Sequence, residues 1–276
     1  MSTVIDALAQ WDALAQREID TCYQRKLSSA TSADALKLRM PVQKGQHTNK
    51  GCPSAWREQV VEWCFQVVDY CEIDRDVVSY AMSYFDRIFP HYCINDRLIE
   101  LVAVTCLYLA IKIHCSNNKV SIDCIISLSG CSFQYDQVVK MERVVLRGLN
   151  WHLHPATPHS FLEIFFSTSA EDDEVMDEIK ETASYLLELA TCDVFFISEK
   201  PSCICTAAIL IALDIVNSPL RSNFMMKKLI ENNDRDVIKH CSIRLKQIYA
   251  MMVKQGAIQE TVTENDVSPT SVIRVN

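Results

Sequence analysis

The sequence predicts an all-α fold in which two consecutive five-helix bundles follow an additional N-terminal helix. Apolar residues recur at three- and four-residue spacing along most of the chain, which is the pattern of helices that bury one face. Only 5 Gly and 8 Pro occur among the 276 residues, and 49% of the residues are hydrophobic. So few turn-forming residues favour long helices over sandwiches and barrels, and the apolar content is sufficient for buried cores.

Residues 1–53 are expected to form one helix and a connector. The helix is predicted over about 2–27, because apolar side chains share one of its faces. These side chains are Val4, Ile5, Leu8, Trp11 and Leu14. Residues 28–53 are rich in Ser, Thr, Lys and Gln and also contain Gly and Pro, which is typical of an irregular connector.

A first domain is predicted over residues 54–154. Its five amphipathic segments lie at about 54–71, 74–90, 95–115, 119–129 and 133–150. The breaks between segments have local causes. Asp74 is suited to cap a helix, Pro90 cannot continue one, and Gly130 can adopt the left-handed conformation that ends one.

The helical pattern starts again at Thr157-Pro158, where a capping hydroxyl precedes a proline suited to the first turn. This second domain is predicted over residues 155–256, and the polar residues 257–276 are expected to form a disordered tail. Its helices are predicted at about 157–169, 171–193, 199–217, 222–231 and 234–254. The third segment of each set is apolar on nearly all sides, so we expect four helices to surround it.

The net charge and the lengths of the apolar stretches indicate which kinds of partner to expect. The formal net charge of -8 disfavours a nucleic-acid partner, because such binders carry basic stripes that displace counterions from phosphates. The longest apolar stretches, 101–113 and 203–216, fall short of the roughly 18 residues of a membrane span. We therefore expect a soluble intracellular protein that binds proteins, with its 13 cysteines as reduced core thiols.

Candidate metal ligands and catalytic groups do not form a known pattern. His152, His154 and His159 lie close together in the connector between the domains and are expected to be partly exposed, and Cys203 and Cys205 alternate, but neither set has zinc-site spacing. The chain has no nucleophile elbow, phosphate-binding loop, dinucleotide fingerprint or kinase signature. We expect no metal, no cofactor and no catalytic residue, so the protein is not expected to be an enzyme.

Four stretches resemble motifs of the cyclin family and occur in the same order. They are WREQVVEW (56–63), YFDRIF (84–89), LVAVTCLYLAIK (101–112) and VVKMERVVLRGLNWHL (138–153). On these residues, the first domain resembles a cyclin box, and the second resembles the more divergent second cyclin fold. The resemblance implies a regulatory subunit that binds and allosterically activates a cyclin-dependent kinase, and thereby controls cell-cycle progression in the nucleus and cytoplasm.

The resemblance also implies roles for individual residues. Arg57 and Asp86 match a structural ion pair that ties the first two helices of the box together. Lys112 and Glu142 match residues of the kinase-binding face, which hydrogen-bond to the backbone of the kinase. The surrounding apolar rim is expected to include Ile113 and Leu146.

Several positions depart from the family pattern. Many cyclins have two glutamates where this chain has His114 and Cys115. The substrate-docking patch of many cyclins is also weakened by polar residues, and docking of kinase substrates is expected only at a reduced set of side chains. These are Trp56, Val60, Trp63 and Gln66. Timed-proteolysis motifs of mitotic cyclins are missing from the N-terminal segment, whereas Ser268-Pro269 is a candidate phosphorylation site.

Two other readings of the sequence stay open. One is a general transcription factor built from paired cyclin folds, which would present a basic surface to DNA. The acidic net charge of -8 counts against it. The other is an unrelated helical protein, either a scaffold that binds other proteins or an enzyme whose site the sequence does not reveal.

Overall fold

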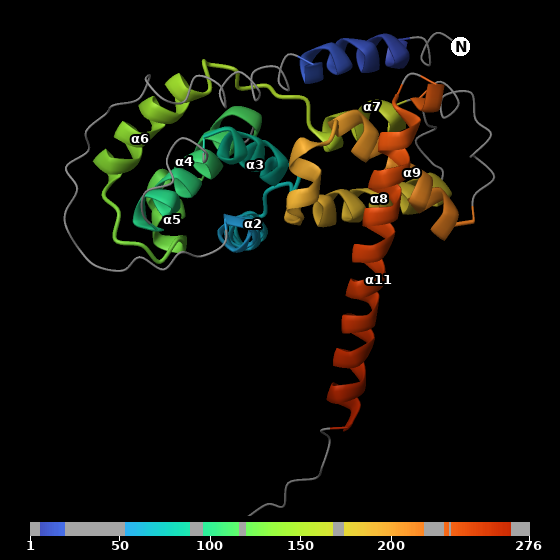
Figure 1. Cartoon of the computed structure of the whole chain (residues 1–276). Coiled ribbons are helices and arrows are strands. Elements are labelled where there is room, and N and C mark those ends of the chain that lie inside the picture. The colour runs from blue at the N-terminus through green and yellow to red at the C-terminus, as the bar shows by residue number, and fades with distance from the viewer. Residues whose placement is uncertain are drawn as a thin grey trace, which may run out of the picture.

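The computed structural model describes residues 6–19, 53–88, 96–115, 120–167, 174–217, 229–231 and 233–265. Within these ranges, the side chains of residues 53–56, 96 and 255–265 are excepted. The described residues form helices and turns and contain no strand, as the sequence predicts. The helices gather into two bundles that lie next to each other (Figure 1).

The first bundle is arranged around its third helix. Its helices are α2 (Pro53–Tyr70), α3 (Val77–Ile88), α4 (Asp96–His114), α5 (Ile122–Leu128) and α6 (Tyr135–Gly148). Helix α4 packs against the other four. Its apolar side chains are buried along nearly its whole length, because a helix that is apolar all round needs neighbours on every side. The predicted central position of this helix is therefore confirmed.

One predicted helix boundary in this bundle is confirmed, and another is wrong. Gly130 has φ +65°, and this left-handed residue follows the end of α5 as expected. Helix α3 begins at Val77 rather than at the predicted Asp74. The reason is an intervening turn, in which the Asp74 carbonyl accepts from the Val77 N–H at 3.2 Å.

The second bundle repeats the arrangement around α9. It contains α7 (Pro158–Phe166), α8 (Glu174–Cys192), the 3₁₀ helix η2 (Val194–Ser198), α9 (Pro201–Ile215) and α11 (Arg235–Asn265). Thr157 caps α7 as predicted, since its side chain accepts from the Ser160 N–H. Helix α9 packs against α7, α8 and α11. Of the helix predicted at 222–231, only residues 229–231 are described, and they are helical.

Helix α11 extends beyond the body of the second bundle (Figure 1). It was predicted to end near residue 254 but continues to Asn265, into the segment 257–276 that was expected to be a disordered tail. Polar composition alone does not end a helix, and residues 257–265 contain neither proline nor glycine. Residues 266–276, which include Ser268, lie outside the described residues.

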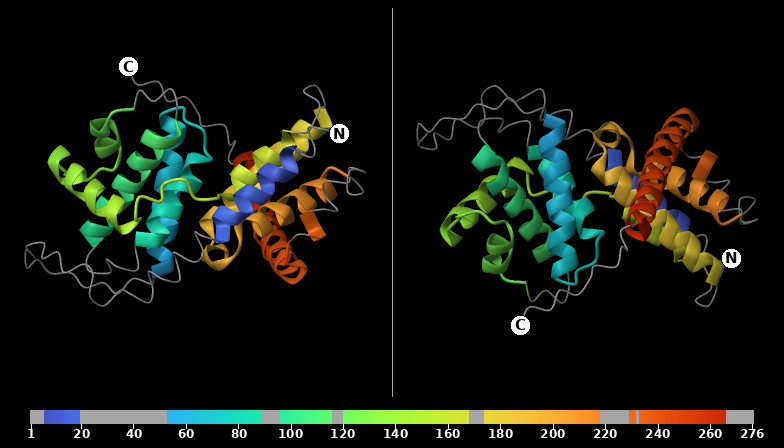
Figure 2. Two further views of the ribbon diagram at one scale, coloured as in Figure 1. Left: turned by 90° about the horizontal axis from the view of Figure 1, so that it is seen from above. Right: turned by 90° about the horizontal axis from the view of Figure 1, so that it is seen from below.

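The N-terminal helix, residues 6–19, belongs to the second bundle although it precedes the first in sequence (Figure 2). Trp11 is only 1% exposed, and its ring centroid lies 4.6 Å from that of Phe161 in α7. Near the other end of this helix, the buried Glu18 carboxylate accepts from the backbone N–H and hydroxyl of Ser202, in the first turn of α9. The remainder of the predicted helix over 2–27 lies outside the described residues.

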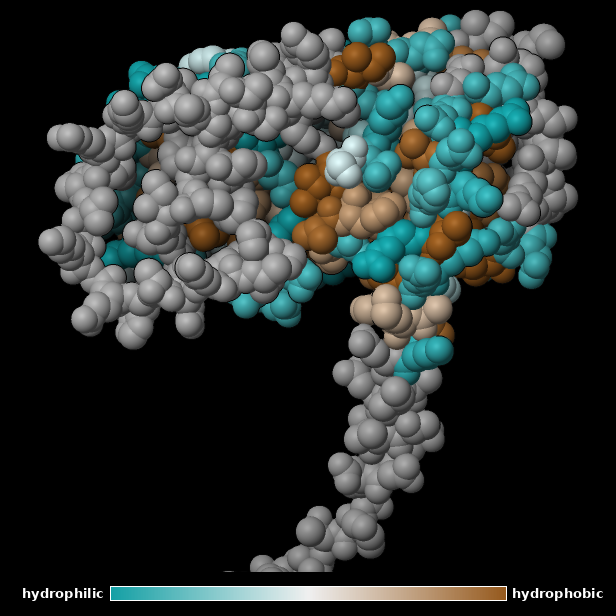
Figure 3. Space-filling model, viewed as in Figure 1, coloured by the Kyte–Doolittle hydropathy of each residue, from teal (hydrophilic) through white to brown (hydrophobic). Residues whose placement is uncertain are grey.

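The surface of the second bundle is mixed in character. Apolar and polar side chains alternate over the face seen in Figure 3. Among the residues that the structure describes, no helix has the length and the apolar character required to cross a membrane.

Candidate functional site

Lys112 and Glu142 lie together on one surface of the first bundle. Lys112 is near the end of α4 and Glu142 is in the middle of α6, and these two helices pack side by side. Lys112 Nζ donates to Glu142 Oε1 at 2.9 Å. The lysine side chain is 52% exposed and the glutamate side chain 15% exposed, so the pair sits at the rim of the α4–α6 contact.

The ion pair leaves binding capacity at the surface. The hydrogen bond from Lys112 to Glu142 raises the pKa of the lysine, so Lys112 is firmly cationic. An ammonium group has three donor hydrogens, and the bond to Glu142 uses one of them. The ammonium also lies 5.7 Å from the centre of the Tyr108 ring, which favours this position of the charge. Lys112 can therefore donate to the backbone of a partner and Glu142 can accept from it, while the ion pair holds both side chains in place.

Two half-buried apolar side chains lie on the same two helices as this pair. Ile113 and Leu146 both pack against the core of the first bundle and keep part of their surface exposed. Tyr135, which the sequence analysis missed, is 55% exposed at the start of α6. Its spacing of seven residues from Glu142 places both on one helical face, and this spacing is the signal that would have found it.

The structure also brings Arg57 and Asp86 together. Arg57 Nε and Nη2 donate to the two carboxylate oxygens of Asp86 at 2.9 and 3.0 Å. The two side chains are only 8% and 10% exposed. Arg57 Nη1 donates in addition to the Thr191 carbonyl at 2.7 Å, near the end of α8 where carbonyls lack partners within the helix. Arg57 thus joins α2 and α3 to the second bundle, a connection that the sequence analysis did not foresee.

Further polar contacts fix the two bundles to each other. Arg75, in the turn before α3, pairs with both oxygens of Asp69 and with Glu188 of α8. The Tyr80 and Ser160 hydroxyls lie 2.8 Å apart, which connects α3 to α7. The orientation of one bundle relative to the other is therefore held by directional bonds.

His114 occupies a position where many cyclins have an acidic residue, and it faces inward. Its ring stacks on Tyr80 with centroids 3.7 Å apart, and its Nε2 lies 2.9 Å from the Tyr84 hydroxyl and 3.1 Å from the Leu153 carbonyl. Burial lowers the pKa of His114, which favours the neutral ring. His114 therefore packs α4 against the segment that follows α6.

The expectation of three partly exposed histidines was wrong for one of them. His152 is half-buried and His154 is exposed, but His159 is buried in α7. His159 Nδ1 lies 2.9 Å from the Ser79 hydroxyl of α3. The contact that buries it comes from the other bundle, so a sequence pattern could not show it.

Burial of His159 predicts a pH-dependent stability. Its pKa is lowered from 6.5 to about 4 by desolvation, so the folded protein keeps the ring neutral while the unfolded chain takes up a proton. We expect this group to stabilise the fold fully above pH 6.5, and to lose its contribution between pH 6.5 and about 4. The free energy of unfolding of His159→Gln should therefore fall less steeply over that window than that of the wild type.

Denaturant titrations at several pH values check this result, with exposed His240→Gln as the matched control. Desolvation raises the pKa of Asp76 to about 6, which gives a slope of opposite sign in an overlapping window. Asp76 is common to all three proteins, so the comparison isolates the histidine. Equal slopes for the wild type and His159→Gln would contradict the assignment.

The predicted substrate-docking residues do not form one exposed set. Val60 is 8% exposed and packs in the core of the first bundle, so little of its side chain is available to a docking partner. Trp63 is half-buried and its indole N–H donates to the Leu128 carbonyl at 3.2 Å. Gln66 is exposed, and the Trp56 side chain lies outside the described residues. Docking at Trp63 and Gln66 stays a prediction.

The cysteines that the structure describes are all unpaired. Five of them, Cys64, Cys106, Cys203, Cys205 and Cys241, are buried, and the others are half-buried. Burial raises the pKa of Cys203 to about 11 and that of Cys241 to about 12, so these thiols stay protonated. Within the described ranges, no group of three or more His, Cys, Asp or Glu side chains is placed to hold a metal ion.

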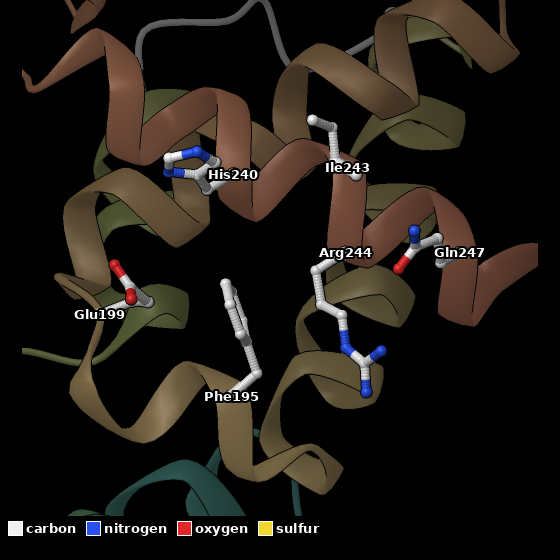
Figure 4. A pocket seen from close by; sticks show the side chains of 6 residues that line it. All are labelled: Phe195, Glu199, His240, Ile243, Arg244 and Gln247. Carbon is white, nitrogen blue, oxygen red and sulfur yellow. The ribbon is translucent and has the colours of Figure 1, made fainter.

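A cavity of about 280 Å³ lies between η2 and α11 (Figure 4). Its lining combines Phe195 with the polar side chains Glu199, His240, Arg244 and Gln247. Arg244 is already paired with Asp193 at 2.6 Å. The lining of the cavity thus contains the Phe195 ring and the Arg244 guanidinium, whose charge is balanced by Asp193.

Fold and surface together define a helical regulator that acts by binding another protein. The chain matches the family model of the cyclin N-terminal domain over residues 30–154 and that of the cyclin C-terminal domain over residues 156–274. It therefore belongs to the cyclin family, whose members are regulatory subunits of cyclin-dependent kinases and not enzymes themselves.

Individual relatives and solved structures agree with this placement. G1/S-specific cyclin-D1 of Xenopus laevis is 26% identical over 238 residues, which cover 80% of this chain and 81% of the relative. G1/S-specific cyclin-D1 of Mus musculus is 24% identical over 208 residues, covering 72% and 70%. The crystal structure of a viral cyclin from herpesvirus saimiri shares the fold with a TM-score of 0.59 and 16% identity, and covers 73% of this chain and 89% of that one.

Proposed function

We propose that this cyclin binds a cyclin-dependent kinase through the α4–α6 surface, activates it allosterically and thereby controls cell-cycle progression. The observation that carries the proposal is the ion pair of Lys112 with Glu142, which is held at 2.9 Å on neighbouring helices at the protein surface. Similarity to the G1/S-specific cyclins supports the cell-cycle role. The proposed places of action are the nucleus and the cytoplasm.

The chemistry of the surface suits recognition of a kinase backbone. Lys112 offers charged donors and Glu142 a charged acceptor, and charge-assisted hydrogen bonds are stronger than neutral ones. The half-buried Ile113 and Leu146 and the exposed Tyr135 supply apolar area beside the pair. An apolar area with a central polar anchor is the usual composition of a stable heterodimer interface.

Activation then follows from differential affinity. A protein kinase needs its regulatory helix turned inward, so that a lysine and a glutamate of its own active site can pair. A partner that binds this arrangement more tightly than the inactive one shifts the population towards it. In this proposal the cyclin contributes binding free energy and no catalytic group.

The test compares two double variants of the full-length chain. Lys112→Ala/Glu142→Ala removes two charged hydrogen-bonding groups, each worth roughly 1.5–3 kcal/mol, so we expect its affinity for the cognate kinase to fall by at least ~100-fold. Glu163→Ala/Lys180→Ala is the matched control, because it removes an exposed ion pair of 3.2 Å from the second bundle. Binding and phosphorylation are measured against a panel of recombinant cyclin-dependent kinases.

The control variant should bind and activate like the wild type, and both variants should keep the helical circular dichroism and melting temperature of the parent. If Lys112→Ala/Glu142→Ala still activates a kinase at wild-type concentrations, the α4–α6 surface is not the binding face.

A further inference from the structure

The cavity between η2 and α11 has no part in the proposed kinase contact. It lies on the second bundle, whereas Lys112 and Glu142 lie on the first. Its volume of about 280 Å³ is just below the roughly 300 Å³ at which sites for drug-sized ligands begin, so it suits a single large side chain. A concave site with an apolar wall and a few convergent polar groups is the usual form of a binding site.

One wall of the cavity is a stripe of side chains along α11. These side chains recur at three- and four-residue spacing and therefore share one face of the helix. They belong to His240, Ile243, Arg244 and Gln247. Cys241 and Leu245 point into the core instead, at 0% exposure, and anchor the helix there. Ile243 is 48% exposed, so the stripe is open to a partner.

The opposite wall is formed by η2 and by the residue that follows it. In Figure 4 the Phe195 ring points from η2 towards α11, with Glu199 on one side and Arg244 on the other. The Phe195 backbone is fixed, because its N–H donates to Asp193 Oδ1 at 2.8 Å. The next residue, Phe196, is buried at 5% exposure and holds η2 against the core. Both walls of the cavity are therefore preformed.

The charges of the lining favour a cationic occupant. The charge of Arg244 is balanced, because Asp193 Oδ2 accepts from its Nε at 2.8 Å and lies 2.6 Å from its Nη2. The half-buried Glu199 carboxylate, by contrast, forms no ion pair with any residue that the structure describes. A partly desolvated carboxylate attracts a cation more strongly than one in bulk water. An anion would meet an Arg244 charge that Asp193 has already neutralised.

We propose that this cavity binds the side chain of an arginine that a second partner protein presents, while the first bundle holds the kinase. A guanidinium is planar, stacks on aromatic rings and donates two parallel hydrogen bonds to a carboxylate. Phe195 supplies the ring and Glu199 the carboxylate, and the aliphatic stem of the arginine packs along Ile243. The site is separate from Trp63 and Gln66, the predicted docking residues for kinase substrates, because these lie on α2.

The test titrates the isotope-labelled full-length chain with the peptide acetyl-Gly-Arg-Gly-amide and follows the backbone amide signals by NMR. The titration runs at about pH 7.5, above the ordinary titration range of histidine. We expect saturable shifts of the Phe195, Glu199 and Arg244 signals at peptide concentrations of about 1 mM, because a single side chain supplies the whole contact. The same peptide with citrulline in place of arginine has the shape without the charge, and it should not saturate the site.

Three variants assign the binding to the cavity. Glu199→Gln removes the carboxylate charge and keeps the shape, so it should weaken binding of the arginine peptide by at least ~10-fold. Phe195→Leu removes the ring and keeps an apolar side chain, and should weaken binding by roughly 2–5-fold. Glu62→Gln changes an exposed carboxylate on α2, so it is the matched control and should bind like the wild type.

The proposal is overturned if the arginine peptide does not saturate the site, or if Glu199→Gln binds it as tightly as the wild type does. Equal binding of the citrulline peptide overturns it as well, because the cavity would then not recognise the charge. Tighter binding of acetyl-Gly-Glu-Gly-amide would show an anion site on Arg244 instead. Lys112 and Glu142 are unchanged in all of these proteins, so the result does not depend on the proposed kinase contact.

Discussion

Replacing Arg57 with Ala is expected to lower the free energy of unfolding by about 3–5 kcal/mol, because the Asp86 carboxylate would be left charged and buried without its partner. Asp86 is 10% exposed and receives two hydrogen bonds from the guanidinium. The substitution also removes the donor to the Thr191 carbonyl, so the contact between the bundles weakens at the same time. Asp86→Ala should destabilise the protein by a similar amount, since it leaves Arg57 unpaired.

Urea or guanidinium titration measures these free energies. The double variant Arg57→Ala/Asp86→Ala should lose less than the sum of the two single losses, because no unpaired charge remains. Lys180→Ala, which breaks an exposed ion pair, serves as the control and should change the free energy of unfolding by at most ~1 kcal/mol. A loss below ~1 kcal/mol in Asp86→Ala would show that the buried ion pair does not stabilise the fold.

Replacing Trp11 with Ala should lower the free energy of unfolding by about 3–5 kcal/mol, the usual range for a fully buried tryptophan. Trp11 is 1% exposed and contacts Phe161 in the core of the second bundle. The substitution removes the main apolar anchor of the N-terminal helix. Limited proteolysis should then cleave within residues 6–19 at protease concentrations that leave the wild type intact.

Ile19→Ala is the control on the same helix, because Ile19 is exposed, and it should change stability by less than ~0.5 kcal/mol. The second contact of this helix, from Glu18 to Ser202, stays in place in both variants. Should Trp11→Ala unfold like the wild type and resist proteolysis equally, the helix would not be part of the folding unit of the second bundle.

Most helices could be predicted from the periodicity of apolar residues. The errors lie at helix ends, which this periodicity does not locate. The start of α3 was placed at Asp74 because an aspartate is a good cap, but a turn through residues 75–76 delays the helix to Val77. The end of α11 was placed too early because polar residues were taken for a tail. Helix ends depend on turn geometry and on helix-breaking residues, and residues 257–265 contain neither Pro nor Gly.

The candidate site was predicted only in part. Motif order indicated that Lys112 and Glu142 share a surface, and the structure places them 2.9 Å apart. Val60 was assigned to a docking surface on the strength of its position in a motif, whereas packing buries it. Tyr135 was missed because it precedes the motif at 138–153 that contains Glu142, although its seven-residue spacing from Glu142 indicates a shared helical face.

The sequence by itself determined the helical content, the succession of two bundles and membership of the cyclin family, because periodicity and motif order are properties of contiguous residues. Only the tertiary structure decided which elements cover one another. Arg57 reaches Thr191 across 134 positions, and Glu18 reaches Ser202 across 184. An apolar stripe shows which face of a helix is buried but not which distant helix buries it, so these contacts depend on how the whole chain packs.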